Sequence, residues 1–350
     1  MVNYRLAKLN DNEQLLYLTR STGMSGKMGL RIDRFPNFFD LNRLRGETHV
    51  YVAEEAGEIL GCISVSDQLF FVEGEKYPLY YISDFKVAKN HRKRGIGLQL
   101  THEVVKYLDQ KHADFAFLNV AKGNKRPFVF FSNRGDYPDF ENIGTFETYE
   151  FVGSKRQKIV QGLTLETTEV TPEIIEYFNA FYAKLQLARV VTADELKNTE
   201  LVVVRKDSEI VGAMALIDTM GLKQNVVLKI PNLLKVGVFL LNGIAKIMGW
   251  SSLPKEHEPV KMLYMKFLAV SSYDKQIISF LVSYAKNQVY KKGYSFVSIG
   301  FHQRDPMIKK LPKVLKFTFY SVGMLVSMKR SEHLMQKIRN GVPYIDYSII

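Results

Sequence analysis

Apolar and polar positions alternate along several short stretches of the chain and take on helical spacing in others. The aromatic and β-branched run at 79–87 is typical of a largely buried strand. From Ile96 the apolar positions Leu100, Val104 and Leu108 recur on one face of a helix. The pattern therefore predicts a strand, a polar turn and a helix in immediate succession.

Similar patterns surround this unit and return in the second half of the chain. Stretches at 48–53 and 59–65 flank a polar turn and predict a β-hairpin before the unit. The repeated order predicts an internal duplication on the scale of a domain, with a boundary near 153–162. Further strands or helices are predicted at 114–120, 149–152, 163–166, 201–204, 209–216, 262–270, 276–291, 294–300 and 317–328.

The turn between the strand at 79–87 and the following helix combines positive charge with glycine. It holds Arg92, Lys93 and Arg94 and the glycines Gly95 and Gly97. The first N–H groups of a helix have no intrahelical partner and carry partial positive charge, and glycine lets a ligand approach the backbone. This combination predicts a site for phosphate oxygens. The alternative is a solvated basic turn whose glycines only begin the helix.

Two common phosphate-binding motifs do not fit this turn. A dinucleotide-binding G-x-G-x-x-G sequence would require glycine where the chain has Leu100. A P-loop would require Gly-Lys followed by Ser or Thr, whereas Gly26 and Lys27 are followed by Met28 and no strand precedes them.

The pattern Arg92-x-x-Gly95-x-Gly97, directly after a strand that ends at Val87, resembles the acetyl-coenzyme A motif of the GNAT superfamily of N-acetyltransferases. The resemblance implies an α/β (α+β) fold of two tandem GNAT-like domains, at 1–155 and 156–350. Each would be a mixed, mostly antiparallel sheet flanked by helices.

The same resemblance implies acetyl-CoA as co-substrate. The turn would hold the pyrophosphate and the end of the strand would bind the pantetheine arm. The implied binding residues are Phe85, Lys86, Val87, Arg92, Lys93, Arg94, Gly95, Ile96, Gly97 and Asn124.

Asp84 is the predicted catalytic base, because the GNAT family often has an acidic residue at this place in the strand. The alternative is a carboxylate that pairs with Lys86 or a nearby arginine. The family often has Tyr seven residues after the Asn, but here Asn124 is followed at that distance by Phe131. Tyr137, Tyr149 and Ser132 are weak substitutes as the acid for the leaving thiol.

The second copy lacks this chemistry. No glycine follows its strand between Ser271 and Gln276, and Phe267 takes the place of Asp84. We therefore predict that the second domain is a degenerate GNAT-like domain without a cofactor site. The tail at 343–347 is aromatic enough to fold back over a cleft.

Charge is concentrated in the second half of the chain. The net charge of +12 divides into +1 for residues 1–155 and +11 for residues 156–350. A lysine-rich solvated surface explains this, while a weak contact with a membrane or an acidic partner stays open. No nucleic-acid motif is present, so no nucleic-acid partner is expected. Scattered histidines predict no metal site.

An apolar insertion at 231–250 is interrupted by Lys235 and Lys246 and is too short to predict a transmembrane span. It favours a helix packed between the domains or beside the substrate cleft, with an interfacial membrane helix as the alternative. The single cysteine, Cys62, and the polar start of the chain favour a cytoplasmic protein.

These features together predict an enzyme, an N-acetyltransferase that moves an acetyl group from acetyl-CoA to a primary amine. The amine-bearing acceptor would be a small molecule or a peptide. A non-catalytic acyl-CoA-binding sensor or scaffold is the alternative, since the usual tyrosine is missing and the second domain is degenerate.

Overall fold

The strand and the helix predicted on either side of the basic turn are present in the structure, as a long strand that ends at Val87 and a helix that begins at Ile96. The computed structural model describes residues 1–21, 29–124, 138–328 and 331–350. The first half contains β1 (Asn3–Leu6), α1 (Asn12–Ser21), β2 (Gly29–Asp33), α2 (Asp40–Arg45), β3 (Glu47–Glu55), β4 (Glu58–Val72), β5 (Glu75–Val87), α3 (Ile96–Gln110), β6 (Phe115–Ala121) and β7 (Asp139–Val152).

The second half repeats the sequence of hairpin, strand, helix and strand. Two of its longer helices begin with side-chain caps: Thr171 accepts a hydrogen bond from the Ile174 N–H, and Asp274 accepts from the Gln276 N–H. It contains β8 (Thr164–Thr168), α5 (Pro172–Tyr182), β9 (Ala188–Arg189), α6 (Ala193–Leu196), β10 (Thr199–Lys206), β11 (Glu209–Asp218), β12 (Gln224–Lys229), α7 (Asn232–Met248), β13 (Met262–Ala269), α8 (Lys275–Lys291), β14 (Phe296–His302), β15 (Lys316–Ser327) and α9 (Glu332–Asn340).

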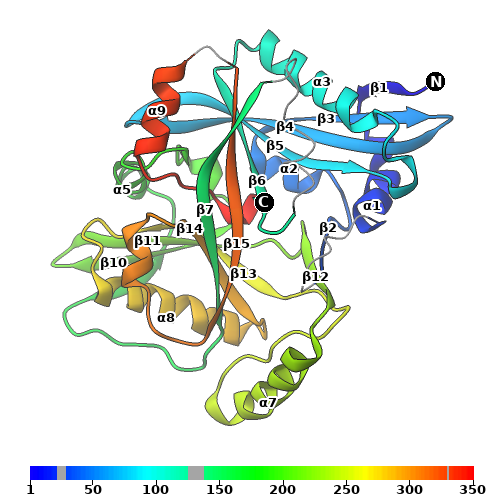
Figure 1. Cartoon of the computed structure of the whole chain (residues 1–350). Coiled ribbons are helices and arrows are strands. Elements are labelled where there is room, and N and C mark those ends of the chain that lie inside the picture. Colours follow the sequence, from blue (N-terminus) through cyan, green and yellow to red (C-terminus); the bar gives the residue numbers. More distant parts are fainter. Residues whose placement is uncertain (22–28, 125–137, 329–330) are drawn as a thin grey trace.

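One 13-stranded sheet runs through both halves (Figure 1). Its strand order is β1-β3-β4-β5-β6-β15-β7-β14-β13-β11-β10-β8, and β9 pairs with β4. The pairs β5–β6 and β13–β14 are parallel, and the other named pairs are antiparallel. The predicted fold class, mixed and mostly antiparallel sheet with flanking helices, is thus confirmed.

The two halves exchange their last strands at the centre of this sheet. β15, from the end of the chain, pairs with β6, while β7 pairs with β14. β7 and β15 also pair with each other, as the long green and orange strands at the centre of Figure 1. Each half is therefore completed by a strand from the other. The domain boundary at residue 155 stays a prediction.

Helices α1 and α3 cover opposite faces of the first half. Leu100 and Val104 of α3 belong to one buried cluster, and Leu15 of α1 and Cys62 of β4 belong to another. Successive side chains of a strand point to opposite faces, so β4 contributes to both clusters. Each fully buried side chain of this size stabilises the fold by about 1.5–3 kcal/mol.

A small second sheet connects the halves on one side and was not predicted. β2 and β12 form this two-stranded antiparallel pair, with Asp33 opposite Gln224. The predicted apolar insertion follows β12 and is largely the helix α7. It does not pack between the two halves, because Phe239 on its outer face is 78% exposed. It projects from the end of the molecule, at the bottom of Figure 1.

The last ten residues fold back into the centre of the protein. The N–H of Gln186 donates to the carbonyl of Val342, and the N–H of Tyr344 donates to the carbonyl of Gln186 at 2.8 Å. The Tyr347 hydroxyl lies 2.5 Å from the Ser321 hydroxyl on β15. Beside this ring, Gly300 on β14 leaves no space for a side chain: an added Cβ would lie 2.1 Å from the Tyr347 ring.

We expect Gly300→Ala to lower the free energy of unfolding by about 1–3 kcal/mol, because the new methyl group must displace the Tyr347 ring. Urea denaturation measures the change. Gly221→Ala is the control, since no atom lies within 4 Å of the corresponding Cβ position, and its effect should stay within about 0.5 kcal/mol. Equal effects of the two substitutions would show that the C-terminal segment is not held at Gly300.

Candidate acyl-CoA site

The basic turn curls tightly between β5 and α3. A short 3₁₀ helix, Lys89–His91, follows β5, and α3 begins at Ile96. Lys93 and Gly95 have φ values of 69° and 78°, in the left-handed region. Positive φ values within a turn orient successive backbone N–H groups toward a common point, as in anion-binding nests. Gly95 is exposed and directly precedes the first turn of α3.

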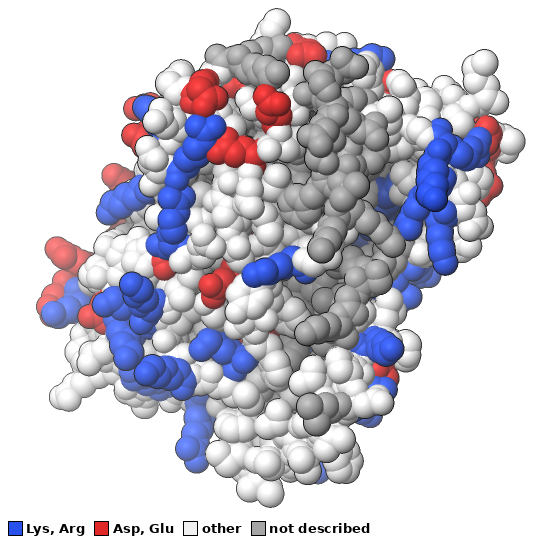
Figure 2. Space-filling model, viewed as in Figure 1, with Lys and Arg blue, Asp and Glu red and all other residues white. Residues whose placement is uncertain are grey.

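Arginine side chains fix the shape of this turn. Nε of Arg92 donates to the carbonyl of Val87 at 3.2 Å, which joins the turn to the end of β5. Arg94 forms an ion pair with Glu55 at 2.8 Å and lies 2.7 Å from His91 Nδ1. Figure 2 shows Lys and Arg side chains gathered on the right, over the end of the sheet where β3, β4 and β5 lie in Figure 1.

Strands β5 and β6 diverge below this turn. Their parallel ladder holds the pairs Tyr80–Ala116 and Tyr81–Phe117. β5 then continues to Val87, and β6 turns toward its other neighbour, β15. This opening brings the predicted residues Phe85, Lys86 and Val87 to the edge at which β6 ends. Parallel strands end at the same edge of a sheet, which also brings Asn124 to this edge.

Of the candidate acids for the leaving thiol, the structure describes Tyr149. Phe131, Ser132 and Tyr137 lie outside the described residues, as does the loop 22–27, where the resemblance to the GNAT family would place the edge of the acceptor site. Tyr149 is a core residue on β7, and its hydroxyl donates to Glu147 at 2.5 Å. Burial and Glu147 raise the pKa of this phenol.

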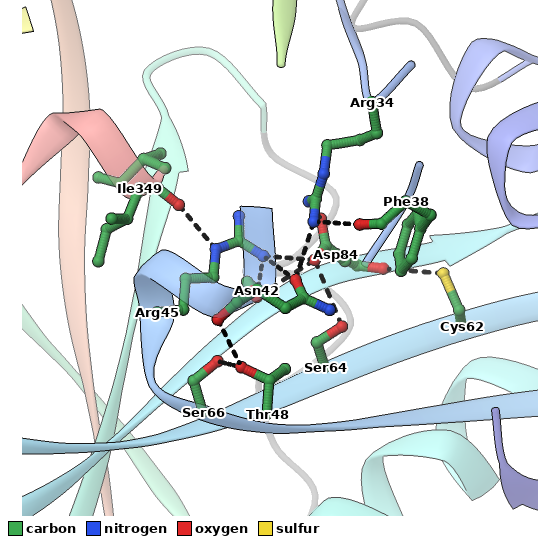
Figure 3. A network of polar contacts seen from close by, with 12 residues as sticks. Arg34, Phe38, Asn42, Arg45, Thr48, Cys62, Ser64, Ser66, Asp84 and Ile349 are labelled. Atoms are coloured by element: carbon green, nitrogen blue, oxygen red, sulfur yellow. Dashed lines mark hydrogen bonds and ion pairs between the residues drawn. The ribbon is translucent and has the colours of Figure 1, made fainter. Parts of the chain in front are cut away.

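Asp84 lies in an irregular part of β5 beside the opening. Ser83 pairs with Ser64 and Lys86 pairs with Cys62, so the strand bulges at the two residues between them. Asp84 adopts a φ of 51°, which is uncommon for a residue other than glycine. The bulge turns its carboxylate toward α2 and the segment before α2 (Figure 3).

Two buried arginines bind the Asp84 carboxylate. Arg34 Nη1 donates to Oδ1 at 2.8 Å, and Arg45 Nη1 donates to Oδ2 at 2.5 Å (Figure 3). Arg34 also donates to the carbonyl of Phe38 and to Oδ1 of Asn42. Arg45 Nε donates to the carbonyl of Ile349 at 2.7 Å. The cluster therefore joins β5, α2 and the C-terminal segment.

Electrostatics in this cluster favour the ionised carboxylate. Burial alone would raise the pKa of Asp84, but Arg34, Arg45 and Lys86 together hold it well below its usual range. Burial and the neighbouring Arg45 lower the pKa of Arg34 to about 10, although Asp84 partly offsets this. The alternative left open by the sequence, pairing of Asp84 with nearby arginines, is thus present in the structure. Its role as base stays a prediction.

Sequence reasoning missed Arg34, Asn42 and Arg45. Asn42 and Arg45 lie three residues apart on α2, a spacing that places them on one helix face. Arg45 binds Asp84, which lies 39 residues further along the chain, and no local pattern connects the two. Asn42 accepts hydrogen bonds from Arg34 and Arg45.

A second group of buried charges lies beside the C-terminal segment. Burial raises the pKa of Glu150 on β7 to about 7, although the Ser298 hydroxyl donates to its Oε1 and Lys223 is nearby. Burial and the charge of Arg45 lower the pKa of Lys223 to about 7. The Lys223 ammonium donates to the backbone oxygens of Tyr347 at 3.0 Å and Ile350 at 2.6 Å.

Comparison with known proteins identifies the class of the region around this opening. Residues 18–132 match the model of the acetyltransferase (GNAT) family. That part of the chain contains β3 to β6, the basic turn and α3, and it belongs to this family. The part of the chain that the family model matches is therefore of the GNAT acyltransferase class. No curated protein matched the chain.

Solved structures of this fold extend over nearly the whole chain. A Saccharomyces cerevisiae N-myristoyltransferase with bound myristoyl-CoA and inhibitors is 11% identical, with a TM-score of 0.60, over 93% of this chain and 80% of that one. A GCN5-related N-acetyltransferase from Anabaena variabilis is 12% identical, with a TM-score of 0.52, over 93% and 72%. A third, from Kribbella flavida, is 12% identical, with a TM-score of 0.51, over 93% and 70%. These similarities establish the fold.

We expect Asp84→Asn to lower the free energy of unfolding by about 3–5 kcal/mol, because it leaves two buried guanidinium groups without a counter-charge. Urea denaturation at neutral pH measures the loss. Asp194→Asn is the control: this aspartate pairs with Lys197, its side chain is 81% exposed, and its removal should cost less than about 1 kcal/mol. Similar losses for the two variants would contradict a structural role of the cluster.

Glu150 should make stability depend on pH. Its folded-state pKa of about 7 lies above the ordinary value of 4.5, so the folded state binds the proton more tightly and loses stability as pH rises through this window. Glutamine cannot ionise. The free energy of unfolding of Glu150→Gln, relative to that of wild type, should therefore rise by about 2–3 kcal/mol between about pH 5 and pH 8. Glu75 is exposed, so Glu75→Gln should show no such gain in the same urea titrations. A stability difference between Glu150→Gln and wild type that does not change with pH would disprove the raised pKa of Glu150.

Proposed function

We propose that this protein transfers an acetyl group from acetyl-CoA to a primary amine. The observation that carries the proposal is the left-handed turn at Gly95, which places the start of α3 directly beside the open end of β5. This arrangement fits a ligand that has a phosphate group at one end and an extended arm at the other. Coenzyme A thioesters have this form.

The residues of the turn fit the pyrophosphate. The backbone from Arg92 to Gly97 would bind it through N–H groups at the positive end of the α3 dipole. Lys93 is exposed and would add charge around it. Arg94 is exposed as well, although its ion pair with Glu55 neutralises it in part. An added Cβ at Gly95 would meet no atom within 4 Å, so the space beside the turn is open to a ligand.

The end of β5 fits the pantetheine arm. Phe85, Lys86 and Val87 would present their backbone groups to it in the manner of an added strand. Asn124 at the end of β6 would contact the co-substrate from the other side of the opening. When bound there, the thioester supplies an activated acyl group, and the chain has to orient it toward the amine.

The amine must lose its proton before it can attack. An alkyl amine with a pKa of about 10.4 is neutral only about once in 10³–10⁴ molecules at pH 7. Recovering the neutral form costs about 4–5 kcal/mol, part of which a positioned base can supply. Asp84 is close to the reacting end of β5, but Arg34 and Arg45 stabilise its ionised form. A role through a water molecule, or in positioning, suits these contacts better than direct proton transfer.

A non-catalytic acyl-CoA sensor is the second candidate. The absence of tyrosine seven residues after Asn124, where the sequence has Phe131, favours it. A cytoplasmic location agrees with both candidates, because the chain has a single cysteine, Cys62, and therefore no internal disulfide. Cys62 is buried, and burial raises the pKa of its thiol to about 12. Such a thiol is unreactive.

Isothermal titration calorimetry with acetyl-CoA tests the site. Wild-type protein should bind, and Gly95→Glu should weaken binding by about 100-fold or more, because a carboxylate then occupies the space beside the phosphate-binding backbone. Gly57→Glu is a matched control. Gly57 also has a positive φ, 83°, and open space at its Cβ position, but it lies in the β3–β4 turn, so binding should be unchanged.

Turnover with a panel of amines then separates the two candidates. Thiol release that depends on an amine supports the transferase. Binding without release for any amine supports the sensor. No binding by the wild type, or equal binding by Gly95→Glu, would refute both.

A further inference from the structure

Helix α7 presents an apolar surface to solvent. Val236, Leu240, Ile244 and Ile247 follow one another at helical spacing and are all exposed. Ile247 is 87% exposed and Phe239, beside this stripe, is 78% exposed. Five large apolar side chains exposed together on one helix of a folded protein mark an interaction surface.

The other face of α7 attaches the helix firmly to the protein. Ala245 is buried, and Val238 and Leu241 pack against the cluster that contains Leu253. The side chain of Asn242 exchanges two hydrogen bonds with the backbone of Leu253, one of them at 2.7 Å. The packing and hydrogen bonds of the inner face therefore hold the apolar outer face in a fixed position.

The charges around α7 have a single dominant sign. Between Asp218 and Glu256 the sequence contains no acidic residue and five lysines, of which Lys223 is buried. Lys235 and Lys246 lie on α7 itself, at the border of the apolar stripe. Glu256 neutralises Lys235 in part, with a distance of 2.8 Å between Nζ and Oε2. In Figure 2 the region of α7, at the bottom of the view, is mostly uncharged with blue side chains at its margin.

A basic hollow of about 440 Å³ adjoins the C-terminal end of α7. Lys246, Lys255 and Lys261 line it together with the indole of Trp250, and Glu258 is the acidic residue among its lining residues. A hollow of this kind offers ammonium groups to a phosphate or carboxylate, next to a surface that attracts hydrocarbon.

We propose that α7 and this hollow bind the surface of an anionic lipid bilayer, with the axis of the helix in the plane of the interface. The outer face of α7 would enter the boundary of the acyl chains, while Lys235, Lys246 and Lys255 would reach the headgroups. No helix in the described part of the chain is long and apolar enough to cross a membrane.

A second copy of the chain is a poorer occupant of this surface. In a two-fold contact α7 would face its own copy, with the same lysines on both sides and no acidic residue on either helix. Like charges would oppose that contact, whereas an anionic headgroup complements them. The proposal does not depend on the acyltransferase activity.

Co-sedimentation of the full chain with vesicles tests the proposal. The vesicles contain phosphatidylserine and phosphatidylcholine in a ratio of roughly one to three, or phosphatidylcholine alone. Binding should be stronger with phosphatidylserine and should weaken as salt is added. The double substitution F239E/I247E should reduce the partition coefficient by about tenfold or more, because burial of two large apolar side chains is lost.

Ile159→Glu is the matched control, because Ile159 is 89% exposed and belongs to the loop between β7 and β8. It should bind vesicles like the wild type. Circular dichroism establishes that all variants are folded. Failure of the wild type to sediment with vesicles, or equal binding by F239E/I247E, would overturn the proposal. A vesicle-free dimer that F239E/I247E dissociates, without vesicle binding by the wild type, would instead assign α7 to a second copy.

Discussion

Two guanidinium groups share one buried carboxylate where β5 bulges, and much of the first half is arranged around that contact. Each of these charges loses several kcal/mol of hydration on burial, so the arrangement is stable only when the partners are held at hydrogen-bonding distance. Arg34 follows β2, Arg45 ends α2, and Asp84 adopts its left-handed conformation in β5. The bulge that opens the end of β5 is thus supported by charges from two other segments.

The same contact extends to the end of the chain. Arg45 donates to Ile349, and Lys223 donates to Tyr347 and Ile350, so cations from both halves hold the C-terminal segment in the interior. Burying a lysine here is costly, which is why its pKa falls to about 7. The backbone oxygens of Tyr347 and Ile350 carry negative charge and compensate part of the cost of burying Lys223. They can do so because the C-terminal segment is packed firmly against this lysine.

The sequence predicted those parts of the fold that depend on neighbouring residues. The strand at β5, the glycine turn and α3 follow from local periodicity and helix-start chemistry, and the second half follows from repetition of the same order. The β2–β12 sheet joins segments about 190 residues apart, and neither strand has a long alternating pattern. The exchange of β7 and β15 was also beyond prediction, because either strand satisfies the same apolar pattern in either half. Arg34 and Arg45 meet Asp84 only once α2 packs beside β5, so their role as its partners could not be predicted from the local sequence.

The exchanged strands make the first half depend on the second, although the second half has no glycine turn of its own. β6 forms one wall of the opening beside β5, and its other neighbour is β15, the last strand of the second half. Tyr347 reaches Asn119 on β6 and Ser321 on β15, so the C-terminal segment also supports that wall. Loss of the second half would leave β6 with an unpaired edge and remove these contacts. The half that lacks the glycine turn therefore completes the structure of the half that has it.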